Sequence, residues 1–357
     1  MKYKRFGRTD TTVSAIGQGT MGIGGYFNRD SHKDDFYIDM LKMGLEYGMT
    51  FVDTAEAYGA GHSEELVGRA VKDCRKDVFI ATKVSPEHLA YDSVIKSAEN
   101  SLRRIRTNYI DLYQIHWPNP AVPLGETLGA MEKLIRDGKV KYIGVGNFSL
   151  RQLKMANEAF PNLRIDSVQI EYNLFDRMIE KDILPYCERE GISVIAYSPL
   201  EGGKFSYESD NIELMQAMAR KYDRAIACII LRWLTYRSPV IAIPKALSTE
   251  HIKENASSVN FDLDEDDIEL IGRTFTKPCI SIPTDRIKVD RNGLDKFVPS
   301  PETLAKDIRN GEILKPIRVV KSEGSNDYDY DLVEGKVRYW AWVIAHNGKV
   351  PIQALVR

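Results

Sequence analysis

Residues 49–84, MTFVDTAEAYGAGHSEELVGRAVKDCRKDVFIATKV, contain two short apolar runs separated by a segment with helical periodicity. The runs at 49–53 and 78–83 are rich in β-branched and aromatic residues, which favour strands. Residues 63–72 instead space their apolar side chains as one face of a helix would. A strand, a helix and a second strand in this order predict a parallel sheet with a crossover helix.

The same pattern recurs along the first 275 residues. Further strands are predicted at 13–17, 109–116, 141–146, 167–172, 193–197 and 240–244. Helices are predicted between them, for example at 34–47, 91–105 and 124–137. Eight such units predict a closed (β/α)8 barrel, although periodicity alone leaves a doubly wound open sheet as an alternative. No G-x-G-x-x-G follows the first strand, so the usual dinucleotide-binding loop of an open sheet is not expected.

Charge and composition exclude several classes of protein. The formal net charge is only -2, from 49 Lys and Arg against 51 Asp and Glu, so no overall field attracts nucleic acid or an anionic membrane. The N-terminal residues MKYKRFGRTD lack the apolar core of a signal peptide, and no apolar run is long enough to span a bilayer. A cytoplasmic protein is therefore expected. The four cysteines stand far apart, which argues against a disulfide framework and a structural zinc site.

Polar residues follow or end three consecutive predicted strands. Asp53, Lys83 and His116 lie at the strand ends, and Tyr58 lies in the loop after Asp53. In a (β/α)8 barrel the carboxyl ends of the strands form the active site. The Lys83 ammonium is expected to favour phenolate and to lower the pKa of Tyr58 from about 10 toward neutrality. Tyr58 could then protonate a carbonyl oxygen, with Asp53 orienting Lys83 and His116 donating a hydrogen bond.

Each of these residues alone is better explained by an ordinary structural role, such as a loop cap, a solvated strand end or a structural histidine. Their joint occurrence favours catalysis. The segments FVDTAEAYGAGHSEELVGRAV, FIATKV and DLYQIHWP resemble the signatures of the aldo-keto reductase family, in this order and at similar spacing. The resemblance extends from about residue 3 to residue 275. It implies hydride transfer from NADPH to an aldehyde or ketone, with the four polar residues as the catalytic group.

The resemblance also implies a cofactor site. In GVGNFS, VQIEYN and AYSPL, Asn147 and Gln169 would bind the nicotinamide carboxamide, and Tyr197 would lie under the ring. The other implied contacts are Gly19, Thr20 and Met21 near the nicotinamide, Ser198 and Leu200 near the pyrophosphate, and Pro244, Lys245, Glu254 and Asn255 around the adenosine phosphate. Lys245 would pair with the 2′-phosphate. His251 stands where the family commonly has Arg, which weakens the preference for NADPH over NADH.

Other features have less specific interpretations. Trp117, Tyr26 and Phe27 could form the wall of an apolar substrate pocket, with core packing as a slightly less favoured alternative. A further specificity loop is expected at 202–210. The acidic run DLDEDDIELI, residues 262–271, is interpreted as the first turn of a helix rather than as a metal site. The six histidines do not form a pair with metal-ligand spacing, so no metal is expected.

The composition changes after residue 275, which predicts a barrel domain at 1–277 and a second domain at 278–357. Strands are predicted at 282–289 and 317–320, with a helix at 302–309. The segments LVEGKVR, residues 332–338, and PIQALV, residues 351–356, resemble the small α+β domain of ParB-like and sulfiredoxin-like proteins.

That resemblance implies that Gly335 and Arg338 approach a nucleotide phosphate at a helix N-terminus. Lys336 and Val337 replace the reactive cysteine and the histidine of sulfiredoxin-like proteins, so neither phosphotransferase nor CTP-switch activity is expected. The second domain could be a packing module. It could alternatively bind nucleotide or DNA, with the barrel acting as an NADP(H) sensor. The four catalytic residues argue against that alternative, since a sensor needs no proton donor.

Overall fold

The computed structural model describes residues 1–159, 163–202, 211–275, 279–322 and 327–356. The chain divides into two compact units, one made of Met1–Trp117 and Gly125–Phe275, the other of Pro118–Leu124 and Thr276–Arg357. The expected specificity loop at 202–210 lies, from residue 203 onward, outside the described residues. The predicted boundary between 277 and 278 lies outside them too and stays a prediction.

The first unit contains eight parallel strands that are neighbours in sequence order. They are β3 (Gln18–Gly19), β4 (Phe51–Asp53), β5 (Phe79–Val84), β6 (Ile110–Ile115), β7 (Val140–Gly146), β8 (Ser167–Glu171), β9 (Ser193–Tyr197) and β10 (Val240–Ala242). The sheet closes on itself because the Gly17 N–H donates to the Ala242 carbonyl over 2.8 Å and the Ala242 N–H donates to Ala15. The predicted (β/α)8 barrel is confirmed, and the open sheet is excluded.

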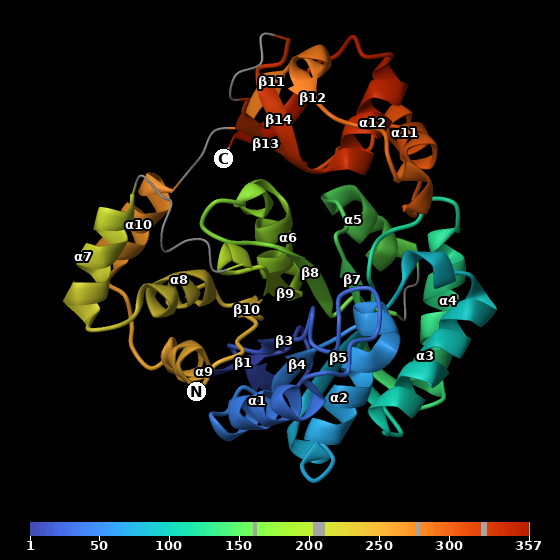
Figure 1. Ribbon diagram of the computed structural model, residues 1–357. Helices are drawn as coiled ribbons and strands as arrows, with labels where there is room; N and C mark the ends of the chain where they lie inside the picture. The colour runs from blue at the N-terminus through green and yellow to red at the C-terminus, as the bar shows by residue number, and fades with distance from the viewer. Residues whose placement is uncertain (160–162, 203–210, 276–278, 323–326, 357) are drawn as a thin grey trace. The chain divides into compact units, whose positions relative to one another are not determined.

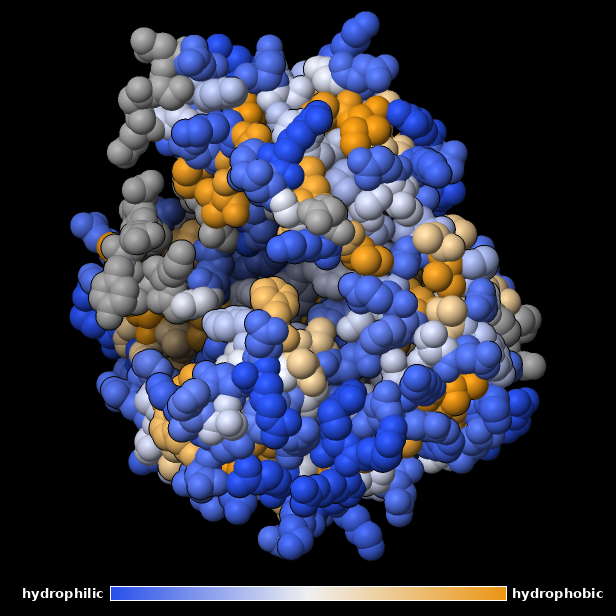
Figure 2. All heavy atoms as spheres, turned by 45° about the vertical axis from the view of Figure 1, so that its right-hand side comes forward, coloured by the Kyte–Doolittle hydropathy of each residue, from blue (hydrophilic) through white to orange (hydrophobic). Residues whose placement is uncertain are grey.

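Helices alternate with these strands and lie outside the ring (Figure 1). They are α1 (Asp34–Glu46), α2 (His62–Ala70), α3 (Tyr91–Ile105), α4 (Leu124–Arg136), α5 (Leu150–Ala159), α6 (Ile183–Glu190), α7 (Ile212–Tyr222), α8 (Ile226–Thr235), α9 (Thr249–Ser257) and α10 (Glu265–Thr274). In α3, for example, Val94, Ala98, Leu102 and Ile105 are buried along one face. Figure 2 turns the side of α3 and α4 forward, and the face that it shows is largely hydrophilic.

The first predicted strand, 13–17, differs from the structure. Residues Thr12–Ser14 form β2, which pairs antiparallel with β1 (Tyr3–Arg5) in a hairpin. The barrel strand β3 therefore starts only at Gln18. The hairpin buries Phe6 against the ring of Phe79, at a centroid distance of 4.8 Å. Because Phe79 begins β5, this hairpin covers the end of the barrel at which the strands start, and the other end is left for the site.

Asp166, just before β8, makes the stability of the barrel dependent on pH. Burial raises its pKa from 3.8 to about 7, although the Ile143 N–H donates to its carboxyl group over 3.2 Å. A raised pKa in the folded state favours the protonated form. This contribution is therefore complete below about pH 3.8, the ordinary pKa of an aspartate carboxyl, and is lost as the pH rises through about 7.

The variant Asp166→Asn keeps an oxygen for the Ile143 N–H but cannot ionise. At about pH 8 we expect it to exceed the wild type in free energy of unfolding by about 1–3 kcal/mol, allowing for the partial exposure of the carboxyl. At about pH 4 the two proteins should be similar. Urea denaturation at both pH values measures the difference, and an equal difference at both would contradict the assignment to ionisation.

In its described residues, the second unit is a five-stranded mixed sheet with two α-helices. Its strands follow the order β11 (Cys279–Ile282), β15 (Ile352–Val356), β13 (Ile317–Lys321), β14 (Tyr330–Glu334) and β12 (Ile287–Lys288). The helices are α11 (Pro301–Arg309) and α12 (Lys336–His346). The predicted strand at 282–289 is interrupted by a 3-10 turn at Thr284–Arg286. The helix predicted at 302–309 and the strand predicted at 317–320 are confirmed within one residue.

Candidate active site

Asp53 and Lys83 form a buried ion pair at the carboxyl ends of β4 and β5. Lys83 Nζ lies 2.5 Å from Asp53 Oδ1, and the side chains are only 1% and 2% exposed. The ammonium also donates to the Thr54 carbonyl over 2.8 Å. Burial lowers the pKa of Lys83, but the charge and hydrogen bond of Asp53, together with the contribution of Tyr58, raise it by more, so the pKa lies above its ordinary value. Lys83 is thus a fixed positive charge.

Tyr58 lies at the start of a short turn, η1 (Tyr58–Gly61), that follows β4. Lys83 Nζ donates to its hydroxyl oxygen over 3.3 Å. Gly59 has a φ of 57°, and a Cβ there would lie 2.3 Å from the Gly24 carbonyl oxygen. Only glycine fits this close approach. The turn therefore places Tyr58 where its hydroxyl meets the ammonium.

The pKa of Tyr58 corrects one prediction. Burial raises the pKa above its ordinary value of 10.0, and the charge of Asp53 raises it further. Lys83 lowers the pKa, but the net shift is still upward. The expectation that Lys83 lowers the pKa of Tyr58 toward neutrality was therefore wrong for this structure. Burial removes the phenol from water and so raises its pKa. The Lys83 ammonium lowers the pKa by less, because it is itself paired with Asp53. Tyr58 therefore remains protonated near pH 7.

His116 follows β6 and forms a T-shaped pair with Tyr58, with the ring centroids 5.7 Å apart at an angle of 79°. Burial lowers its pKa from 6.5 to about 3, and the positive charge of Lys83 lowers it as well. The imidazole is therefore neutral near pH 7, and a neutral imidazole can donate only one hydrogen bond. The structure thus brings all four predicted catalytic residues together.

Three of the predicted nicotinamide contacts lie within or directly after the next three strands. Asn147, after β7, donates through Nδ2 to the His116 carbonyl over 3.2 Å, and its Oδ1 accepts from the Tyr197 hydroxyl over 2.9 Å. Gln169, in β8, donates through Nε2 to Asp53 Oδ2 over 2.7 Å. Asn147 and Tyr197 are partly buried and Gln169 is buried. Two side-chain amides and an aromatic ring thus lie beside the four predicted catalytic residues.

The remaining predicted cofactor residues are spread along the rim and the adjacent helix. Thr20 is buried, and its N–H donates to the Asp53 carbonyl over 3.0 Å. Gly19, Pro244 and Asn255 help line one small cavity of about 10 Å³. Met21 and Ser198 are exposed, and Leu200 and Glu254 are partly buried.

The expected phosphate residues are both exposed. Lys245 places Nζ 5.5 Å from the ring centroid of Tyr26. His251 lies in the first turn of α9, where its backbone N–H donates to Ser248 Oγ over 3.2 Å. Its ring is thus at the surface. Tyr26, Phe27 and Trp117 are 58%, 79% and 44% exposed, so their role as pocket walls stays a prediction.

Sequence reasoning missed the amides that hold the second oxygen of Asp53. Besides the donation from Gln169, Gln114 Nε2 lies 3.5 Å from Asp53 Oδ2, within a strand that is buried throughout. Gln114 lies between Tyr113 and Ile115 in a predicted apolar strand. Because buried polar side chains require hydrogen-bond partners, this pattern could have indicated that Gln114 bonds to another buried polar group.

The second unit uses Arg338 internally. Gly335, at a φ of 101°, precedes α12, and Arg338 lies in the first turn of that helix. The guanidinium donates to the carbonyls of Lys315 and Pro316 and to Glu334 Oε1, over 3.2, 3.0 and 3.1 Å. These contacts attach the helix to its own sheet.

The predicted helix turn in the acidic run is confirmed, since Glu265, Asp266 and Asp267 form the first turn of α10. No group of three His, Cys, Asp or Glu side chains with the geometry of a metal site occurs among the described residues. None of the described helices is long and apolar enough to cross a membrane.

Comparisons with known proteins agree with the fold and the motifs. The model of the aldo/keto reductase family matches residues 15–274. Methylglyoxal reductase YeaE of Escherichia coli is 33% identical over 276 residues, which cover 75% of this chain and 93% of that protein. Glyoxal reductase of Bacillus subtilis is 34% identical over 236 residues, covering 65% and 81%.

Solved structures are similar as well. The thermostable aldo-keto reductase Tm1743 has 41% identity and a TM-score of 0.74, covering 77% of this chain and all of that one. An aldo/keto reductase of Klebsiella pneumoniae, in complex with NADP and acetate, has 33% identity and a TM-score of 0.70, covering 78% and 96%. The matched family model spans most of the chain, so this protein belongs to the aldo/keto reductase family.

Proposed function

We propose that this protein reduces an aldehyde or ketone to the alcohol, with bound NADPH supplying the hydride and Tyr58 supplying the proton. The observation that carries the proposal is the buried cluster in which Lys83 Nζ lies 2.5 Å from Asp53 and 3.3 Å from the Tyr58 hydroxyl. The similarity to reductases of methylglyoxal and glyoxal, and to a reductase crystallised with NADP, supports it. The same residues would catalyse the reverse reaction, the oxidation of the alcohol to the aldehyde or ketone.

His116 and Tyr58 act directly on the carbonyl oxygen of the substrate, and Lys83 and Asp53 act through Tyr58. As negative charge develops there, the neutral His116 donates a hydrogen bond and Tyr58 transfers its proton to the oxygen. The phenolate that remains on Tyr58 is stabilised by the Lys83 ammonium, which Asp53 keeps charged. The high pKa of Tyr58 before the reaction keeps the proton in place until it is needed.

The side chains around this group also fit the cofactor. Asn147 and Gln169 offer amide donors and acceptors of the kind that a carboxamide needs, and Tyr197 offers a flat face. Lys245 and His251 lie at the surface, where a phosphate would meet Lys245 as a permanent cation. We assign the remaining contacts of the cofactor to Gly19, Thr20, Met21, Ser198, Leu200, Pro244, Glu254 and Asn255.

The reaction can be tested directly. Purified protein should oxidise NADPH when a panel of small aldehydes and ketones is added, as measured by the absorbance of the reduced cofactor. Dicarbonyl aldehydes belong in the panel because relatives are named for them. If no member of the panel is reduced, the proposed function is wrong.

The variant Lys245→Ala should abolish the preference for NADPH over NADH. In the wild type we expect NADPH to bind roughly 10- to 100-fold more tightly, as one charge-assisted contact to a phosphate would give. The variant should bring the two dissociation constants together while the constant for NADH stays unchanged. Fluorescence titration measures both, with Lys253→Ala, an exposed lysine of α9, as control. Equal affinities in the wild type would refute this role.

The ParB-like nature of residues 278–357 is a separate proposal. Its support is a strand, β14, that leads through Gly335 in a left-handed conformation into α12, followed by the closing strand β15. The bonds of Arg338 to its own unit argue against a phosphate contact, so a packing role is preferred over a nucleotide- or DNA-responsive regulator. Titration of the full chain with nucleotides and DNA distinguishes the two. The cytoplasmic location stays a prediction.

A further inference from the structure

The turn that follows β9 has a strained backbone. Ser198, its first residue, has a φ of 49°, and Glu201 has a φ of 48°. Residues with a Cβ are unfavourable in this left-handed region, and they persist there where surrounding contacts fix them. The Ser198 carbonyl accepts from the Glu201 N–H over 3.1 Å, which closes the turn. The direction of this carbonyl therefore decides the shape of the turn.

Asn173, which lies just after β8, holds the same carbonyl. Its Nδ2 donates to the Ser198 carbonyl over 3.2 Å. Its Oδ1 accepts from the N–H groups of Phe175 and Asp176, over 2.9 and 2.8 Å. The residue is only 1% exposed. Loss of either kind of bond would leave a buried polar group without its partner, which is costly.

The bond from Asn173 to Ser198 extends the barrel sheet beyond the end of β8. The parallel pairing of β8 with β9 ends at Glu171 and Tyr197. The next backbone bond, from the Tyr172 N–H to the Tyr197 carbonyl, is long at 3.5 Å. One residue further along, the side chain of Asn173 supplies the donor in place of the backbone. Asn173 thus fastens the first residue of the turn to the chain that follows β8.

Tyr197, the residue before this turn, is also held at its hydroxyl. The hydroxyl donates to Asn147 Oδ1 over 2.9 Å, and Asn147 Nδ2 donates to the His116 carbonyl over 3.2 Å. Tyr197 belongs to β9 and Asn147 follows β7, so the side chain reaches across β8, the strand between them. The ring is therefore fixed at one end by Asn147 and at the other by the turn that begins at Ser198.

We propose that Asn173 is a positioning residue for the nicotinamide half of the cofactor. By holding the Ser198 carbonyl it fixes the turn after β9, and through this turn it fixes the ring of Tyr197. The inference rests on the proposed function, which assigns Tyr197 to the nicotinamide face and Ser198 to the pyrophosphate. Asn173 acts through these two residues and not on the reacting atoms.

Two variants remove the bond to Ser198 and keep the other contacts of the side chain. Asn173→Asp has the same shape and still offers an oxygen to the N–H groups of Phe175 and Asp176, but it has no N–H for the Ser198 carbonyl. Asn173→Ser is neutral. Its hydroxyl can accept in the same turn, but it lacks the amide that reaches Ser198. Circular dichroism and thermal denaturation establish that both variants fold, and agreement between them excludes an effect of the new negative charge.

Fluorescence titration of the full chain measures the consequence for cofactor binding without turnover. We expect both variants to bind NADPH and NADH about tenfold more weakly than the wild type, as the loss of one buried hydrogen bond would give. Adenosine 2′,5′-bisphosphate carries the adenosine and the 2′-phosphate but no nicotinamide, so its dissociation constant should be unchanged. A general loosening of the barrel would weaken all three ligands in parallel, and that result would overturn the proposal.

Asn157→Asp is the matched control. Asn157, in α5, also accepts from one backbone N–H, that of Ile165, over 3.1 Å, and donates through Nδ2 to the Tyr186 hydroxyl over 3.3 Å. The substitution removes the same kind of donor, and none of these three residues is assigned to the cofactor. NADPH should therefore bind to this variant as it binds to the wild type. The positioning role is refuted if the control weakens NADPH as much as Asn173→Asp does.

The proposed function and this inference fail differently. A wild type that binds NADPH but reduces no carbonyl refutes the proposed function, and the titrations still measure the role of Asn173. An active wild type whose Asn173 variants bind NADPH as tightly as before refutes only the positioning role. A wild type without affinity for NADPH refutes both.

Discussion

Replacing Tyr58 with phenylalanine is expected to lower kcat for carbonyl reduction roughly 10²- to 10⁴-fold while leaving the dissociation constant of NADPH almost unchanged. The substitution removes only the hydroxyl, which among the described residues accepts a 3.3 Å hydrogen bond from Lys83. The ring and its edge contact with His116 remain. Single-turnover absorbance measures the chemical step, and fluorescence titration measures cofactor binding.

Tyr113→Phe is the matched control for this prediction. Tyr113 is fully buried in β6, and its hydroxyl has no hydrogen-bond partner among the described residues. Removal of that hydroxyl should leave kcat unchanged and should not reduce stability, since no hydrogen bond is lost. A Tyr58→Phe variant that turns over as fast as Tyr113→Phe would show that another group supplies the proton.

Replacing Lys83 with methionine is expected to abolish activity and to lower the free energy of unfolding by about 3–5 kcal/mol. Methionine fills a similar volume, but Asp53, 2% exposed, then lacks its cation and keeps only the amides of Gln169 and Gln114. The variant leaves the buried Asp53 carboxylate without a counter-charge, and this lowers the free energy of unfolding. Urea denaturation, followed by circular dichroism, measures the loss.

The double variant Asp53→Asn with Lys83→Met separates charge from packing. Without either charge, the unfolding free energy should return to near that of the wild type, because a buried ion pair and a neutral pair of similar volume differ little in stability. Activity should stay absent. Additive losses in the double variant would instead indicate that both side chains are needed for packing, and the charge argument would be wrong.

The barrel was predictable because its strands are short apolar runs separated by helical segments. Strands such as Ser193–Tyr197 agree with the predicted range. Residues 13–17 were not predictable, since periodicity cannot tell a barrel strand from a hairpin strand whose partner is Tyr3–Arg5. The grouping of Asp53, Lys83 and His116 followed from their positions at the ends of consecutive strands.

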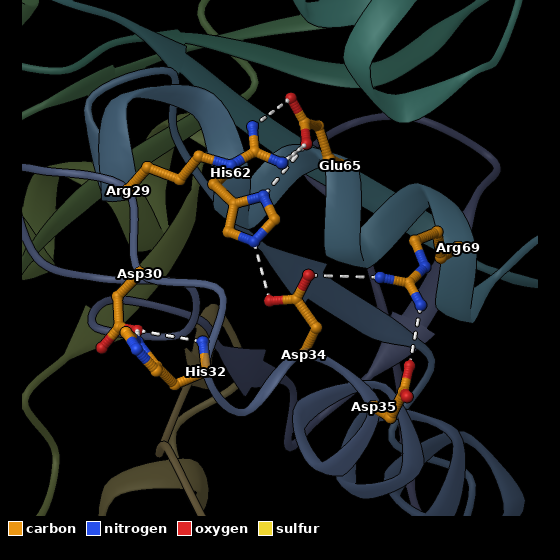
Figure 3. Close-up of polar contacts among 8 residues, drawn as sticks. All are labelled: Arg29, Asp30, His32, Asp34, Asp35, His62, Glu65 and Arg69. Carbon is orange, nitrogen blue, oxygen red and sulfur yellow. Dashed lines mark hydrogen bonds and ion pairs between the residues drawn. The ribbon is translucent and has the colours of Figure 1, made fainter.

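The electrostatics of the site could not be predicted in the same way. The sequence predicts that Tyr58 lies near Lys83 and Asp53. It does not show how completely the phenol is removed from water, and this burial decides the sign of the pKa shift of Tyr58. The contacts of His62, the first residue of α2, could not be predicted for a related reason. Its Nε2 lies 2.7 Å from Asp34 Oδ1 (Figure 3). Asp34 stands 28 positions earlier, and only the packing of α1 against α2 brings the two together.

The barrel can close only after its last strand has been synthesised. The seam is formed by Ala15 and Gly17 on one side and Ala242 on the other, from opposite ends of the barrel sequence. A chain emerging from the ribosome cannot make these bonds until its last barrel strand is available. The contact order of the seam is high, so its formation is expected to be slow. Until then the nascent sheet has two unpaired edges, a hazard for aggregation that chaperones would relieve.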